Sequence, residues 1–148
     1  MIKYFFTLFT VLVSLLSFSQ NNKATELYIT GNSNFKAGKF REAITNYTKL
    51  MELVDENTVK KTCYINRGLS RDRIKEYDLA ISDFTEAIKL DSTDMASFID
   101  RGLSKMHAGY LEKAKEDSRL LGESPEKVFL FRELLLKEDE LNKKNKDA

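Results

Sequence analysis

The sequence predicts an all-α solenoid of three helix–turn–helix repeats, and three observations support this fold class. Three glycines are spaced by 37 and 34 residues, namely Gly31, Gly68 and Gly102. Three alanines follow these glycines by twelve residues each time, namely Ala43, Ala80 and Ala114. Within the middle unit, apolar residues of 80–88 fall at i, i+1, i+4, i+7 and i+8, which is the stripe of an amphipathic helix. A period near 34 residues is typical of stacked helix pairs.

The N-terminal segment 1–19 has the layout of a secretory signal peptide. Lys3 precedes the uncharged and largely apolar run Tyr4–Phe18, and the small residues Ser17 and Ser19 precede a cleavage point before Gln20. A helix of this run would span about 22 Å, which is short of the hydrocarbon core of about 30 Å. The alternative is an uncleaved N-terminal anchor. We expect an exported protein, periplasmic or secreted, with no membrane span after cleavage and one domain over 20–148.

The three predicted repeats cover about 24–57, 61–94 and 95–125, with the insertion Thr58-Val59-Lys60 after the first. Gly38 and Gly109 fall at the turn between the two helices of a repeat, where a left-handed backbone conformation is useful. Lys75 takes this place in the middle repeat, so its turn is expected to differ slightly.

These residues resemble the tetratricopeptide repeat family over about 100 positions. The second repeat carries much of the family pattern at Tyr64, Gly68, Ala80, Phe84 and Ala87. The Leu before the glycine, the aromatic residue three positions after it and the proline near the repeat end are missing in all three units. Small residues at the glycine and alanine positions allow the paired helices to approach closely. The resemblance implies a right-handed superhelix.

The resemblance also implies a non-catalytic protein–protein interaction module or scaffold, here of the bacterial envelope, that binds a peptide or partner helix in a concave groove. The implied groove residues are Tyr28, Asn32, Phe35, Lys36, Ile65, Leu69, Arg73, Ile99, Leu103, Met106 and His107. The remaining groove positions fall on Thr25, Thr62, Asp72 and Ala96. Either Ile65 and Ile99 line the groove floor, or they belong to the core between neighbouring repeats.

Some family members clamp the C-terminal carboxylate of a chaperone, and this sequence lacks much of that clamp. Asn32 and Asn66 match the clamp pattern, whereas Tyr28, Ala96 and Asp100 depart from it. The carboxylate of Asp100 would repel an acidic ligand.

Two repeats share an Arg and an Asp sixteen residues apart. These are Arg67 with Asp83 and Arg101 with Asp117. Both residues change together in the first repeat, to Thr30 and Asn46. The joint change predicts an ion pair, either within a repeat or across to the next, as between Asp83 and Arg101.

The C-terminal segment predicts a capping helix over about 125–143. Phe129, Leu130 and Leu136 widen its apolar surface beyond one stripe. Either this helix covers the end of the solenoid, or a homodimer or another partner covers it. The second case gives an alternative function, a homo-oligomeric structural subunit or adaptor of an envelope complex that docks through this helix.

Composition argues against other classes of function. The 148 residues hold 24 Lys and Arg against 23 Asp and Glu, so the charge is too balanced for a nucleic-acid binder. The single His107 and single Cys63 cannot build a usual metal site or a catalytic pair. We therefore expect no enzyme activity and no cofactor, with His107 at the groove rim. Cys63 is expected to be half-buried, the alternative being an intermolecular disulfide.

Overall fold

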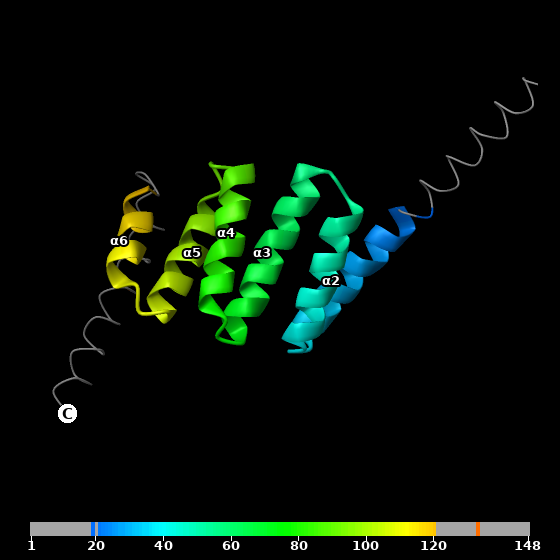
Figure 1. Cartoon of the computed structure of the whole chain (residues 1–148), viewed down its shortest axis with the longest axis horizontal. Helices are drawn as coiled ribbons and strands as arrows, with labels where there is room; N and C mark the ends of the chain where they lie inside the picture. Colours follow the sequence, from blue (N-terminus) through cyan, green and yellow to red (C-terminus); the bar gives the residue numbers. More distant parts are fainter. Residues whose placement is uncertain (1–18, 20, 121–132, 134–148) are drawn as a thin grey trace, which may run out of the picture.

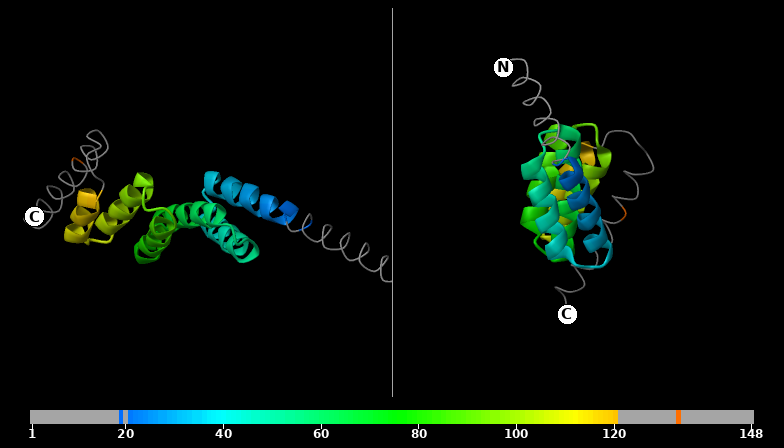
Figure 2. Two further views of the ribbon diagram at one scale, coloured as in Figure 1. Left: turned by 90° about the horizontal axis from the view of Figure 1, so that it is seen from above. Right: turned by 90° about the vertical axis from the view of Figure 1, so that its right-hand side faces the viewer.

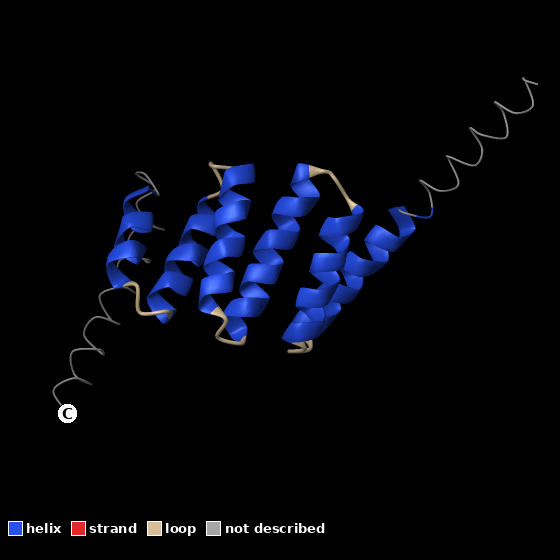
Figure 3. Cartoon of the chain, viewed as in Figure 1, coloured by secondary structure: helices blue, strands red, loops and turns tan. Residues whose placement is uncertain are grey.

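The computed structural model describes residues 19, 21–120 and 133, and it confirms the all-α solenoid (Figure 1). A first helix covers 21–36. It is followed by α2 (Phe40–Leu53), α3 (Asn57–Arg73), α4 (Tyr77–Leu90), α5 (Met95–His107) and α6 (Leu111–Leu120). Helices and short connecting turns make up the described part of the chain, without a strand (Figure 3).

The helices alternate between two rows. Seen from above, helix 21–36, α3 and α5 lie in one row, and α2, α4 and α6 lie in the other (Figure 2). Each helix packs on the next one along the chain, as the contacts of α2 with α3 and of α4 with α5 show. The repeats therefore stack as three helix pairs, and one row of helices presents a continuous face.

Close helix packing explains the spaced glycines. A Cβ atom on Gly31 would lie 2.8 Å from Cε1 of Tyr47, and one on Gly68 would lie 3.0 Å from the Phe84 ring. Real Cβ atoms do not approach so closely, so each glycine lets an aromatic ring of the partner helix lie against the backbone. Ala43 and Ala80 are fully buried at the same seams. The structure thus confirms the role inferred for the small residues.

The three turns within the repeats share one backbone geometry. Gly38, Lys75 and Gly109 have φ values of 74°, 64° and 81°. At each turn the next residue's amide donates to a carbonyl five positions back, as from Glu76 to Arg71 at 2.9 Å. The expectation of a different middle turn was wrong, because helix packing imposes the left-handed conformation on Lys75 as well.

The insertion Thr58-Val59-Lys60 lengthens a helix instead of forming a loop. α3 begins at Asn57 and has 17 residues, against 13 in the corresponding helix α5. The extra residues form an additional N-terminal turn of α3, so the repeat register is kept.

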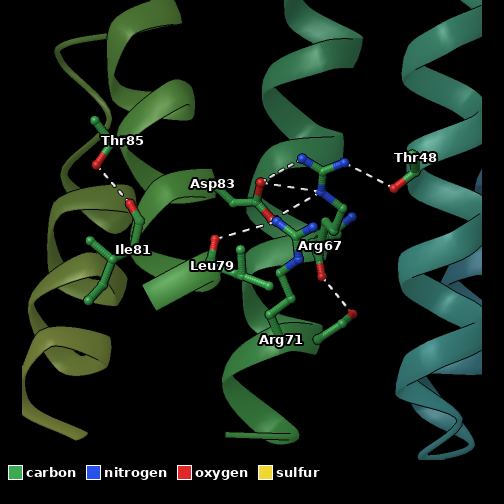
Figure 4. Close-up of polar contacts among 9 residues, drawn as sticks. Thr48, Arg67, Arg71, Leu79, Ile81, Asp83 and Thr85 are labelled. Atoms are coloured by element: carbon green, nitrogen blue, oxygen red, sulfur yellow. Dashed lines mark hydrogen bonds and ion pairs between the residues drawn. The ribbon is translucent and has the colours of Figure 1, made fainter. Parts of the chain in front are cut away.

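The predicted ion pairs form within each repeat. Arg67 donates from Nε and Nη2 to the Asp83 carboxylate at 3.0 and 2.7 Å, and Arg101 binds Asp117 in the same way at 3.0 and 2.6 Å. Arg71 also donates to Asp83, at 2.7 Å (Figure 4). The alternative pairing of Asp83 with Arg101 is not formed.

Each of these arginines also reaches back to the preceding repeat. Nη1 of Arg67 donates to Oγ1 of Thr48 in α2 at 2.9 Å (Figure 4). Arg101 donates in the same way to Thr85 in α4, at 3.3 Å. The pair therefore links neighbouring repeats as well as the two helices of one repeat.

Two predicted segments lie outside the described residues. These are the signal peptide 1–19, apart from residue 19, and the capping helix 125–143 with Phe129, Leu130 and Leu136, apart from residue 133. No helix in the described ranges has the length and apolar character needed to cross a membrane.

Candidate functional site

The predicted groove residues lie on the row formed by helix 21–36, α3 and α5, which we name the A-helix face. These three helices run in the same direction, so their C-terminal ends lie along one edge (Figure 1). Lys36, Arg73 and His107 each close one of the helices and are exposed. The cations expected at one rim of the groove are therefore placed along one edge.

The apolar residues of the A-helix face differ in how far they are available to a ligand. Tyr28 is 38% exposed, and its neighbour Ile29, which the family pattern did not select, is 61% exposed. Met106 is only 6% exposed and packs with Ala114, so it belongs mainly to the core. Four predicted residues are half-buried, namely Ile65, Leu69, Ile99 and Leu103.

Three of the predicted positions also support the hydrophobic core. Ile99 and Leu103 pack against the cluster of Met106 and Ala114. Phe35 packs against the first core cluster and meets Phe40 edge-on at 5.6 Å between ring centroids. The core reading thus applies to part of each side chain, while the half-buried remainder faces outward.

A cavity of about 330 Å³ opens between helix 21–36 and the N-terminal part of α3. Its apolar lining comes from Ala24, Tyr28, Leu50, Val54 and Val59. The polar lining comes from Asn21, Thr25, Glu56, Thr58 and Thr62. Val59 and Thr58 belong to the inserted turn of α3, which sequence reasoning noted as an insertion but did not connect with a site.

Tyr47 holds Asn32 in place at the centre of the A-helix face. The buried Tyr47 hydroxyl donates to Oδ1 of Asn32 at 2.8 Å. Burial raises the pKa of Tyr47 to about 12, so the phenol stays protonated and remains a donor. The Asn32 amide oxygen is thus engaged inside the repeat.

The α5 end of the A-helix face carries negative charge. Asp72 of α3 accepts a hydrogen bond from Ser104 at 2.8 Å and lies 3.1 Å from Nδ1 of His107. The His107 ring also packs on Tyr77. Burial, together with the nearby carboxylates of Asp94 and Asp72, raises the pKa of Asp100 to about 6.

Cys63 is fully buried, deeper than expected. It packs with Leu27, Ala43, Tyr47 and Leu50 in the core between the first two repeats. Burial raises the pKa of its thiol to about 11. A second chain has no access to this sulfur in the folded protein, which argues against the intermolecular disulfide.

Among the described residues, no group of three or more His, Cys, Asp or Glu side chains is arranged to hold a metal ion. His107 is engaged with Asp72 and Tyr77 at the edge of the A-helix face. The geometry offers apolar surface, hydrogen-bonding groups and charge, which suit the binding of a polypeptide.

Comparisons with known proteins agree with this geometry. A family model described as tetratricopeptide repeat matches residues 62–94. The solved structure of the first TPR of Spaghetti (RPAP3), bound to the HSP90 peptide SRMEEVD, is 31% identical. It superposes with a TM-score of 0.67, and the match covers 81% of this chain and 95% of that one. The chain belongs to the tetratricopeptide repeat family.

Larger tetratricopeptide repeat relatives match over the same region. Human DnaJ homolog subfamily C member 7 is 34% identical over 89 residues, which is 59% of this chain and 18% of the relative. Mouse RNA polymerase II-associated protein 3 is 37% identical over 97 residues, which is 66% of this chain and 14% of the relative. The chain therefore spans less than a fifth of these relatives.

Proposed function

We propose that this tetratricopeptide repeat chain is a non-catalytic interaction module that binds a peptide or helix of a partner protein on its A-helix face. The observation that carries the proposal is the cavity between helix 21–36 and α3, which adjoins the exposed side chains of Tyr28 and Ile29. Apolar surface left open beside a cavity favours the docking of another chain. The RPAP3 domain with its bound HSP90 peptide supports this use of the fold.

The acidic peptide bound by that relative is a poor model for the ligand here. The Asp100 carboxylate lies near Asp72 and Asp94, where another carboxylate would be repelled. Asn32 keeps the residue type of the chaperone clamp, but its amide oxygen is already bound by Tyr47. We therefore propose a polypeptide ligand without proposing the chaperone tail.

Affinity co-purification from the native cell tests the proposal. The test variant is Tyr28→Ala/Leu69→Ala/Leu103→Ala on the A-helix face. A matched control removes three exposed apolar side chains elsewhere, as Leu79→Ala/Leu90→Ala/Tyr110→Ala. Circular dichroism first establishes that both variants fold. A partner lost only with the test variant supports the proposal, and partners kept by both variants would move the interface to another surface, such as the C-terminal segment.

We further propose that the module acts outside the cytoplasm, after export. The support is the sequence of residues 1–19, with Lys3, an apolar run and small residues before Gln20. The intact mass of the protein isolated from its native cell tests this proposal. A chain that begins at Gln20 supports it, and a chain that retains residues 1–19 in the cytoplasmic fraction contradicts it.

A further inference from the structure

We infer that the A-helix face selects an extended segment with a bulky apolar side chain and a Lys or Arg about three residues away. The apolar side chain occupies the cavity between helix 21–36 and α3, and the cation lies beside Asp100. This inference rests on the proposed function and adds the chemical class of the partner segment.

The cavity suits an apolar anchor in size and lining. Its volume of about 330 Å³ lies at the lower end of the range of small-ligand sites, so it suits one or two side chains. Leu50, Val54 and Val59 supply its apolar wall. The Thr25 and Thr62 hydroxyls donate to carbonyls four residues back in their own helices, at 3.0 Å each, so they make little demand on a ligand.

The inserted turn makes this cavity a particular feature of the first seam between repeats. α3 exceeds α5 by four residues, and its inserted residues Thr58 and Val59 line the cavity. The turn therefore adds a wall that a repeat of standard length would lack. This relation between an insertion and a cavity is independent of the charges on α5.

The charge at the other seam determines which residue accompanies the anchor. Within residues 21–120, no cation or hydrogen-bond donor is paired with Asp100. Asp72 is shared by Ser104 and His107. Asp94 accepts from Ser97 at 2.7 Å. A Lys or Arg of the ligand would give Asp100 the partner that the chain itself does not provide.

The spacing of the two features follows from helix packing. Neighbouring packed helices lie about 8–10 Å apart. An extended peptide rises by about 3.3 Å per residue. A segment that crosses from the first seam to the second therefore needs about three residues between its anchor and its cation.

Selection from a phage library of random nine-residue peptides, displayed without free C-termini, tests this inference with the full chain as bait. We expect at least tenfold enrichment of peptides that carry Phe, Leu, Ile or Met with Lys or Arg about three positions away, in either order. Thr25→Trp fills the mouth of the cavity and should abolish the enrichment. Thr45→Trp is the matched control, because Thr45 is an exposed helical threonine with the same bond to a carbonyl four residues back.

A second pair of variants tests the charge. Asp100→Asn should lower the preference for Lys or Arg over Glu about fivefold, whereas Glu42→Gln, an exposed acid in the first turn of α2, should leave it unchanged. Selected peptides that are acidic or lack the apolar anchor would overturn the inference. The same holds for no enrichment, or for enrichment that survives Thr25→Trp. If the A-helix-face variant still loses its native partner in that case, the proposed function stands and only the ligand class is wrong.

Discussion

Replacing Arg67 with Met tests whether the ion pair that links the first two repeats stabilises the fold. The Asp83 side chain is 3% exposed and receives two bonds from Arg67, and Arg67 donates a third bond to Thr48. Breaking a buried ion pair typically costs about 3–5 kcal/mol. Arg71 keeps its bond to Asp83 in the variant, so we expect the lower part of this range, about 2–3 kcal/mol.

Urea unfolding followed by far-ultraviolet circular dichroism measures this cost. With a urea slope of about 2 kcal/mol/M, the midpoint should fall by about 1–1.5 M. Arg67→Lys should give an intermediate loss, because one ammonium cannot reproduce the fork that binds both Asp83 and Thr48. Arg73→Met is the matched control, since it removes an exposed arginine from the same helix and should change stability by less than about 0.5 kcal/mol. Equal midpoints for Arg67→Met and Arg73→Met would refute the reasoning.

Three further predictions concern the turn, a buried carboxyl and the thiol. Lys75→Gly should stabilise the chain by about 0.5–1 kcal/mol, because glycine adopts the φ of 64° without steric cost; a lower urea midpoint would contradict this. Asp100→Asn should raise the melting temperature at pH 7.5, by about 1–2 kcal/mol in stability, and leave it unchanged at pH 4. The folded-state pKa of about 6 lies above the unfolded value of about 3.9, so stability is lost as pH rises through about 6; an equal effect at both pH values would contradict this sign. Cys63 should react with an aromatic disulfide reagent on the order of 100-fold more slowly in the native chain than in urea, and equal rates would show that the thiol is accessible.

The helix pairs and the ion pairs could be predicted because they leave simple marks on the sequence. A glycine that admits an aromatic ring, as at Gly31, must recur once per repeat. Arg67 and Asp83 change together in the first repeat, and a paired change points to a contact. The comparison of repeats could not decide between the two pairings, because the same spacing recurs in both directions.

Features that depend on small shifts between helices could not be predicted. The left-handed conformation of Lys75 follows from the geometry of its two helices, which outweighs a local cost of about 1–2 kcal/mol. Met106 and Leu103 both fit the groove pattern, yet Met106 turns towards Ala114 and is buried. The cavity depends on how the inserted turn of α3 lies against helix 21–36, which periodicity alone does not reveal.

Site-specific photo-crosslinking in the native cell tests most directly whether the A-helix face is the recognition surface. A benzophenone amino acid is placed at Leu69 on α3, and at Leu79 on α4 in the other row as the control. The account predicts a discrete crosslinked partner from position 69 and none from position 79. The same partner crosslinked from position 79 alone would contradict it.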